Sequence, residues 1–178
     1  MRSVPVEFMV EEDTSKVIKM IPTSPIEVVR FGQMKGYFQI TFQATTPFWM
    51  TPMEVLSFEL EKDEVFTIHN PRNIQDKHGN YDVYPKIIFR DIEIPTTSST
   101  STSRLTLHNS SPRGRDVEFT NITAGERIEM HHRIVNAQYN QHIFHNWNKQ
   151  PFFLVENLNI LAVNTNCSID VHVQFPIF

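Results

Sequence analysis

The sequence predicts an all-β protein: an antiparallel β-sandwich preceded by an extended N-terminal arm or a small β subdomain. Its 178 residues include 14 Phe but only 5 Gly, and aromatic and β-branched side chains favour the pleated, half-buried surface of a sheet. Apolar and polar residues alternate along several segments, which is the pattern of strands with one buried face. Turn-forming residues separate these segments at intervals of about 8 to 12 residues in the second half of the chain, a spacing typical of sandwiches and barrels.

The clearest strand lies at the C-terminal end, over residues 167–177. Its odd positions are apolar and are predicted to face the core: Cys167, Ile169, Val171, Val173, Phe175 and Ile177. Its even positions are polar and are predicted to face solvent: Ser168, Asp170, His172 and Gln174. Because strand side chains alternate between the two faces of a sheet, we expect the odd row to be buried as a unit.

A second alternating segment covers residues 36–44. Its apolar side chains are predicted to point inward from a single strand: Phe38, Ile40, Phe42 and Ala44. Shorter segments of the same kind occur at residues 105–107, 117–119 and 128–130. They predict further strands of the sandwich.

Proline content divides the chain into two predicted parts. Five of the 11 prolines fall within residues 1–57, so this part is expected to be the arm or small subdomain, and residues 58–178 are expected to form the sandwich. A segment of this size buries too small a fraction of its surface to form a large core of its own. Its apolar side chains therefore need cover from the sandwich or from neighbouring subunits. The candidate assembly contacts are Phe31, Phe48, Trp49 and Met50.

Charge and cysteine content exclude several classes of protein. The 16 Lys and Arg residues against 20 Asp and Glu residues give a formal net charge of -4, which argues against a nucleic-acid-binding protein. A single cysteine, Cys167, excludes an intramolecular disulfide and a zinc site built on paired cysteines. No apolar run approaches the roughly 20 residues that span a bilayer, and no signal-peptide core is present. We therefore expect a soluble protein without a membrane span.

The histidines and the possible nucleophiles predict neither a metal site nor a catalytic site. His131 and His132 are adjacent, so on a strand they face opposite sides and cannot easily share a metal ion. We expect His132 to lie on the buried row and His131 to be exposed. The sequence lacks a nucleophile elbow, a phosphate-binding glycine loop and a dinucleotide fingerprint. These observations predict no enzyme activity and no cofactor.

Residues 139–147 combine aromatic rings with amide and imidazole groups. The candidate contact residues are Tyr139, His142, His145 and Trp147. Three interpretations are open. The rings could belong to the core, they could form a protein interface, or they could bind a glycan, because a ring face stacks on the CH groups of a sugar while amides bond its hydroxyl groups.

Two segments resemble phage distal tail proteins. Residues 35–48, with the sequence KGYFQITFQATTPF, resemble the end of that family's first domain, and residues 80–88, NYDVYPKII, resemble the entry into its second domain. Further matches to the second domain lie at residues 105–109, 121–126 and 152–160. Within the last of these, Asn157 stands where the family usually has Gly. The resemblance covers roughly residues 30–178, and only 35 residues precede Gly36, so we expect a first domain shorter than the family's.

The resemblance implies a non-catalytic structural subunit of the phage tail tip or baseplate, made in the host cytoplasm and located in the virion. Its partners would be the tail tube, the tail hub and the receptor-binding protein, and it would be a homo-oligomer or part of a larger assembly. The second domain would be a sandwich of the galectin or jelly-roll kind. The alternatives from other classes are a carbohydrate-binding β-sandwich module and a β-sandwich enzyme.

Overall fold

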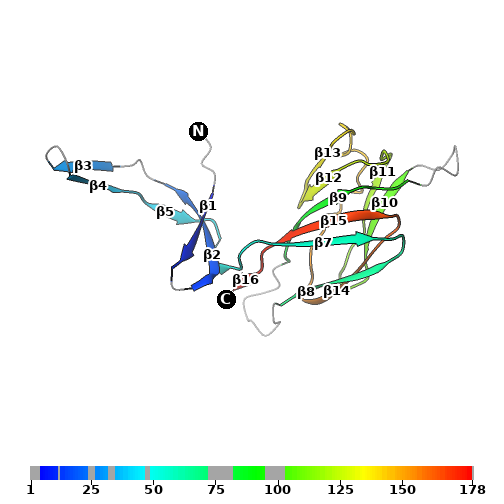
Figure 1. The fold of residues 1–178 in the computed structure, drawn as a ribbon, viewed down its shortest axis with the longest axis horizontal. Coiled ribbons are helices and arrows are strands. Elements are labelled where there is room, and N and C mark those ends of the chain that lie inside the picture. Colours follow the sequence, from blue (N-terminus) through cyan, green and yellow to red (C-terminus); the bar gives the residue numbers. More distant parts are fainter. Residues whose placement is uncertain are drawn as a thin grey trace. The chain divides into compact units, whose positions relative to one another are not determined.

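The computed structural model describes residues 5–11, 13–23, 27–31, 35–46, 49–71, 82–94 and 103–177, and within them it contains strands and turns but no helix (Figure 1). The chain divides into two compact units. The first consists of Met1–Pro52 with Pro176–Phe178, and the second of Met53–Phe175. The predicted boundary after residue 57 falls inside a strand of the second unit, β7 (Glu54–Leu60).

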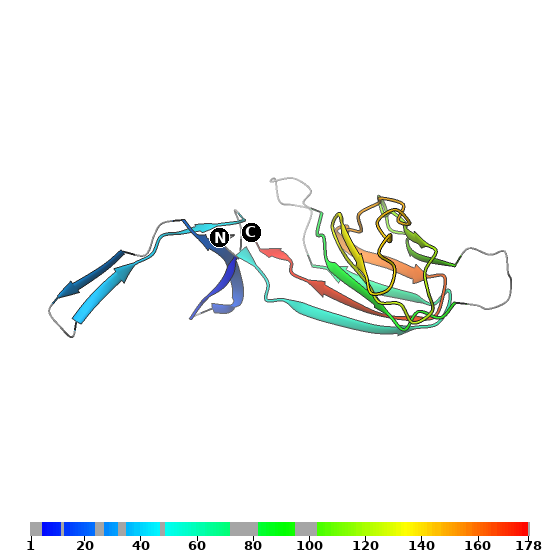
Figure 2. The same cartoon turned by 90° about the horizontal axis from the view of Figure 1, so that it is seen from above.

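The second unit is a sandwich of two antiparallel sheets. The four-stranded sheet has the order β11 (Val117–Thr120), β10 (Arg104–Asn109), β14 (Asn157–Val163), β8 (Val65–Asn70). The five-stranded sheet has the order β13 (Ile134–Ala137), β12 (Ile128–His131), β9 (Lys86–Arg90), β15 (Cys167–Val173), β7. Figures 1 and 2 show β15, in red, lying between β7 and β9. The predicted all-β sandwich is confirmed.

The core lies between these two sheets and depends on the alternation read from the sequence. In β15 every odd residue from Cys167 to Val173 is buried and every even residue is half-buried. Phe89 of β9 meets Phe119 of β11 edge to face at 5.9 Å between ring centroids, a contact that joins the two sheets. Other fully buried side chains in the core are Ile68, Ile87, Leu105, Leu107, Ile128, Met130, Leu154 and Leu161.

The alternation of β15 stops earlier than the sequence predicts. The strand ends at Val173, so Gln174 does not continue the solvent-facing row and is buried, with 7% of its surface exposed. Phe175 remains in the core, but Ile177 belongs to a different strand, β16 (Pro176–Ile177), which is part of the first unit. The prediction of one strand over residues 167–177 is therefore wrong beyond Val173.

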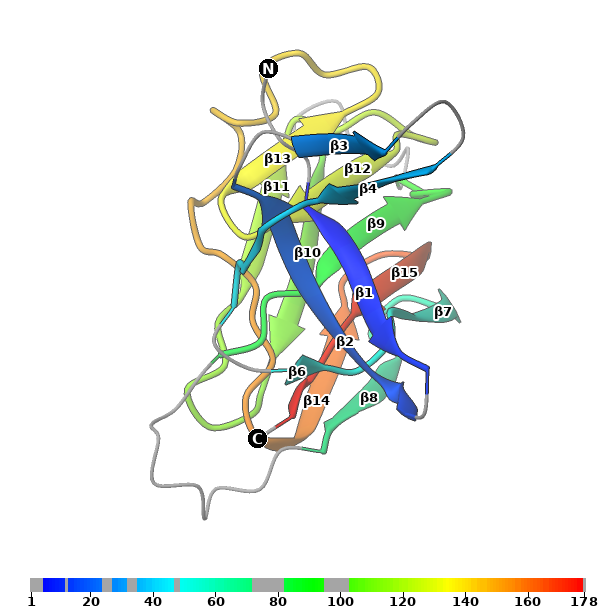
Figure 3. The same ribbon diagram turned by 90° about the vertical axis from the view of Figure 1, so that its left-hand side faces the viewer.

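The first unit contains small sheets. One has the order β1 (Val6–Val10), β2 (Asp13–Pro22), β6 (Trp49–Met50), β16, and β5 (Phe42–Ala44) also pairs with β2. The other is a two-stranded hairpin of β3 (Glu27–Phe31) and β4 (Lys35–Gln39), which Figures 1 and 3 show side by side. Val17 is the only described residue of this unit that is buried.

The inward row predicted over residues 36–44 is not formed. The segment is split between β4 and β5, which belong to different sheets. Phe38 is 68% exposed and Phe42 is 37% exposed, Ala44 is exposed, and Ile40 lies between the strands and is half-buried. Alternation alone identifies two faces of a strand, but a face is buried only where a second layer covers it. Among the described residues of this unit, Phe8 supplies part of such cover to Phe42, at 4.8 Å between centroids.

Two of the motifs that resemble the tail family contain residues with left-handed backbone geometry. Gly125, in the segment 121–126, has φ of 72°, and Asn157 has φ of 63°. This region suits glycine, and asparagine tolerates it better than most other residues. The structure thus explains why Asn can stand at position 157 where the family usually has Gly.

Substitutions at Asn157 test this explanation. The side chain is exposed, so Asn157→Gly is expected to leave the free energy of unfolding nearly unchanged. Asn157→Val places a β-branched residue in the left-handed region and is expected to destabilise the protein by about 1–2 kcal/mol. Denaturant unfolding measures both variants. Equal losses of stability in the two would contradict the backbone explanation.

Adjacent substitutions in β15 test the register of the core. Val171 is 1% exposed, so Val171→Asp buries an unpaired carboxylate and is expected to prevent soluble folding. His172, the next residue, is half-buried on the outer face, and His172→Ser is expected to change stability only slightly. Soluble expression and thermal unfolding distinguish the two variants, and similar behaviour would show that the register is different.

Candidate interaction sites

The loop that follows β13 places the predicted contact residues in different environments. Trp147 is 4% exposed, belongs to the core, and donates a hydrogen bond from Nε1 to the carbonyl oxygen of Gln150 at 3.2 Å. Tyr139 is 59% exposed, and His142 and His145 are also exposed. The buried ring of Trp147 leaves no face free to stack on a ligand, so the four residues do not form one aromatic platform.

The exposed part of this loop includes two residues outside the predicted contact set, Phe144 and Lys149. Phe144 is 48% exposed, and the ammonium group of Lys149 lies 3.5 Å from the centre of its ring. The ring centroids of His142 and His145 lie 6.4 Å apart, and the backbone N–H of His145 donates a hydrogen bond to the carbonyl oxygen of His142. Phe144 and Trp147 are aromatic residues of the same short segment. The sequence pattern alone therefore did not show that one is exposed and the other is buried.

A buried carboxylate holds this loop in place. Glu126 is fully buried, and its two oxygens accept hydrogen bonds from the backbone N–H groups of Asn140, at 2.7 Å, and Thr123, at 3.0 Å. The Asn140 side chain in turn donates to the carbonyl oxygen of Asn121 at 3.2 Å. Both carboxyl oxygens have hydrogen-bond partners, as burial of polar atoms requires. Residues 121–126 therefore hold the start of the loop after β13 in place through these hydrogen bonds.

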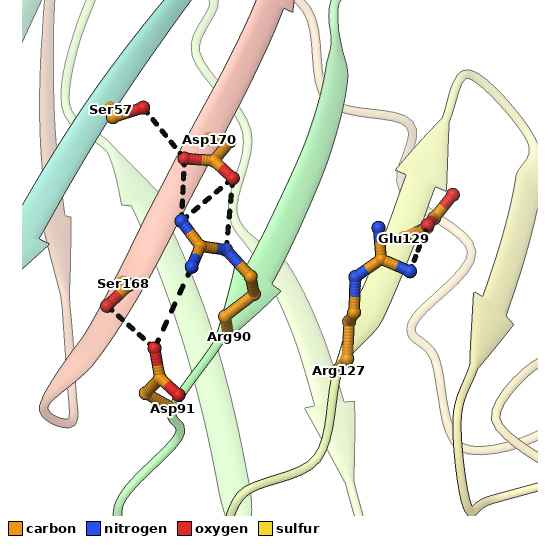
Figure 4. A network of polar contacts seen from close by, with 7 residues as sticks. All are labelled: Ser57, Arg90, Asp91, Arg127, Glu129, Ser168 and Asp170. Atoms are coloured by element: carbon orange, nitrogen blue, oxygen red, sulfur yellow. Dashed lines mark hydrogen bonds and ion pairs between the residues drawn. The ribbon is translucent and has the colours of Figure 1, made fainter.

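The outer face of the five-stranded sheet carries a polar network (Figure 4). The Arg90 guanidinium donates two hydrogen bonds to the Asp170 carboxylate, from Nε at 3.0 Å and from Nη2 at 2.9 Å, and Ser57 donates a third at 2.8 Å. These hydrogen bonds link three neighbouring strands, β7, β15 and β9. These donors lower the pKa of Asp170, the Arg90 hydrogen bonds most of all, while the same pair raises the pKa of Arg90.

An acidic hollow of about 680 Å³ opens beyond the C-terminal end of β9. Its acidic lining residues are Glu59, Glu61, Asp63, Glu64, Asp91 and Glu93. Cys167 also lines it but is only 5% exposed, and burial raises the pKa of its thiol to about 12. A thiol with this pKa stays protonated near neutral pH and is a poor nucleophile.

A basic hollow of about 770 Å³ opens at the other end of β9, before its first residue. Its charged or titratable lining residues are Asp82, Arg113, Arg115, His132, Arg133 and Lys149. Tyr84, Gln150 and Phe153 also line it. The two ends of the sandwich therefore carry opposite charge.

The histidines do not form a metal centre within the described residues, where no group of three or more His, Cys, Asp or Glu side chains is placed to hold an ion. His132 is exposed, contrary to the prediction, whereas His131 is exposed as predicted. His132 lies in the turn between β12 and β13 with φ of 54°. A residue in a hairpin turn leaves the strand alternation, so the buried row ends at Met130.

The predicted assembly residues of the first unit are described in part. Trp49 and Met50 form β6 and are half-buried, and Met50 is paired with Val17 of β2. Phe31 ends β3, and its side chain is outside the described part of the structure, as is all of Phe48. In the described part of the chain, no helix is long and apolar enough to cross a membrane.

Comparison with known proteins places this architecture among phage tail proteins. The family described as phage tail C-terminal domain matches residues 51–173. The crystal structure of the Dit protein of phage SPP1, described as a paradigm of the hub adsorption apparatus in phages that infect Gram-positive bacteria, matches with a TM-score of 0.55 at 12% sequence identity. The match covers 98% of this chain and 67% of that chain. No curated protein matches the chain.

The fold and the family match define a structural component of a phage tail. At 12% identity the SPP1 protein establishes likeness of fold, and the family match spans more than half of the chain. The chain belongs to the phage tail C-terminal domain family. The resemblance to phage distal tail proteins that the sequence motifs indicated is confirmed.

The polar network predicts a pH-dependent contribution to stability. Because the pKa of Asp170 is lowered in the folded state, its contribution is complete above the unfolded value of about 3.9 and is lost as the pH falls through the folded value. Asp170→Asn is therefore expected to lower the melting temperature at neutral pH, by a modest amount because Arg90 is partly solvated. The difference from wild type should shrink below about pH 3.9.

A matched control is Asp91→Asn. This carboxylate lies 4.0 Å from Arg90 and its side chain is 75% exposed, so its removal should have a smaller effect at every pH. Thermal unfolding over a pH series measures both variants. A difference between Asp170→Asn and wild type that is independent of pH would contradict the ionic contribution.

Proposed function

We propose that this chain is a non-catalytic structural subunit of the phage tail tip or baseplate that connects the tail tube to host-recognition components. In this assignment the first unit makes the assembly contacts with neighbouring subunits, and the sandwich is the separate, independently packed domain. The tail family and the fold of the SPP1 Dit protein support the general role. The single observation that carries the finer assignment is the exposed apolar surface of the first unit.

The first unit exposes large apolar side chains and, unlike the sandwich, has almost no buried core among its described residues. Those described are Val6, Met9, Val29, Tyr37, Phe38 and Phe42, each at least 37% exposed. Among the described residues of this unit, only Val17 is buried. Large apolar side chains exposed around so small a core are expected where a protein contacts other molecules. Neighbouring subunits or other tail proteins would bury it.

The hairpin of β3 and β4 supports the same assignment. A two-stranded hairpin is at best marginally stable in water when nothing packs against it. Its strands pair with each other in a regular register from Val28 opposite Phe38 to Arg30 opposite Gly36. Its described side chains, those of Val29 and of residues 37–39, are exposed. Such a hairpin is suited to docking on a neighbouring sheet, where its edges gain hydrogen bonds and its rings gain cover.

Substitution of Phe38 tests the proposal in the full chain. Phe38 is 68% exposed, so Phe38→Ser should not disturb the fold of the subunit. Burial of a Phe side chain contributes about 1.5–3 kcal/mol, so the variant is expected to weaken self-association or incorporation into tails by at least about tenfold. Light scattering after gel filtration and tail-assembly assays measure these effects.

Ile134→Ser is the matched control. Ile134 is 65% exposed but lies on β13 of the sandwich. It is expected to assemble as the wild type does. If instead Ile134→Ser impaired assembly and Phe38→Ser did not, the assembly contacts would lie on the sandwich and the assignment of the two units would be wrong.

A further inference from the structure

The basic hollow of the sandwich has a surplus of positive charge that the described residues do not neutralise. Arg113, Arg115, Arg133 and Lys149 are all exposed, and Asp82 is the one acidic residue among the described residues of the lining. Asp82 lies 3.7 Å from Arg113. Arg133 and Arg115 have no ion pair among the described residues. Although the chain has a net charge of -4, four of its 16 Lys and Arg residues line this one concavity, where they attract an anion.

Three of the lining residues of the basic hollow have left-handed backbone geometry, and two others with this geometry, Asp63 and Asp91, line the acidic hollow. Arg113, His132 and Lys149 have φ of 65°, 54° and 62°, so three of the seven described non-glycine residues in the left-handed region line this one hollow. Glycine would relieve the strain at each position. Non-glycine residues in this region occur in turns and also at ligand sites, so the geometry is compatible with a site here but does not by itself identify one.

Aromatic and amide groups stand beside the cations. The half-buried ring of Tyr84 meets the exposed imidazole of His132 edge to face at 4.5 Å between centroids, and lies 6.0 Å from Phe153. The Arg115 guanidinium is held beside this group by a hydrogen bond to Gln150 Oε1 at 3.0 Å. Rings next to hydrogen-bond donors suit the CH faces and the hydroxyl groups of a sugar.

From this arrangement we propose that the basic hollow binds a saccharide that carries a phosphate or carboxylate group. The guanidinium groups would bind the anionic group, since their forked donors match its geometry. Tyr84 and His132 would contact the sugar ring. This site goes beyond the assembly role proposed above and is distinct from residues 139–147, whose Trp147 ring is buried.

The surroundings of the hollow favour a sugar over an acidic peptide. The described lining residues lie in loops and turns rather than on a strand: before β9, between β10 and β11, between β12 and β13, and in residues 149–153. An extended peptide would be held mainly by backbone hydrogen bonds to a strand edge, which this lining does not offer. The volume of about 770 Å³ falls within the range of sites for small ligands.

Ligand-observed saturation-transfer NMR on the full chain tests the proposal, with glucose 6-phosphate and glucuronate as probes and glucose as the neutral comparison. At least one charged sugar is expected to bind in the millimolar range, more tightly than glucose, and inorganic phosphate is expected to compete only weakly. Whichever charged sugar binds better identifies the anionic group. In the double variant Arg115→Gln, Arg133→Gln, binding of that sugar is expected to weaken about tenfold or more.

Arg104→Gln is the matched control, because Arg104 is an exposed cation on β10 that does not line the hollow. It should bind as the wild type does, and circular dichroism should show that all variants are folded. Equal loss in Arg104→Gln, or no preference for charged sugars over glucose, would overturn the proposal. Tighter binding of an acidic peptide than of the sugars would also overturn it. A further contrary result would be that no sugar binds while the chain self-associates and the double variant abolishes this self-association. The last result would assign the hollow to the acidic end of a second copy.

Discussion

The apolar row of β15 is the contact on which the sandwich depends. Its strand lies between β7 and β9 and pairs with both, so its position sets the register of three strands of the five-stranded sheet. Ile169, Val171 and Val173 point from it into the core, each no more than 1% exposed. The same geometry places Asp170 on the outer face, where Arg90 and Ser57 bind it across the neighbouring strands. Hydrophobic burial therefore fixes which face of β15 points into the core. Because side chains alternate, it also places Asp170 on the opposite face, where the ionic hydrogen bonds form.

Buried polar side chains fix what the hydrophobic core leaves undetermined, namely the paths of the loops. Glu126 holds the loop after β13 through two backbone N–H groups. Asn159 is fully buried and both accepts from the N–H of Val155, at 2.8 Å, and donates to its carbonyl oxygen, at 2.9 Å. The side chain of Asn70 donates to that same carbonyl oxygen at 3.2 Å. Two of the motifs that resemble the tail family are thus explained by hydrogen bonding of backbone groups that would otherwise be buried without partners.

The two units differ in how far each satisfies its own apolar surface. The sandwich covers its core with two sheets, and what it leaves exposed at the ends of β9 is charged: acidic beyond Asp91 and basic before Lys86. The first unit exposes rings such as Tyr37 and Phe38. Apolar surface suits permanent contacts between subunits, whereas an exposed charged hollow suits a soluble, exchangeable ligand.

The sequence by itself determined the fold class, the buried row of β15 and the relation to phage tail proteins. These follow from local information: a period of two, turn residues, and short motifs whose Gly125 and Asn157 have backbone geometry that few residues accept. Only the tertiary structure decided which apolar faces are covered, so Phe38 is exposed and Trp147 is buried although both belong to aromatic-rich segments. It also brought Tyr84, Arg115 and Arg133 around one hollow. Burial and convergence depend on which distant segments pack together, and that information is not contained in the pattern of any one segment.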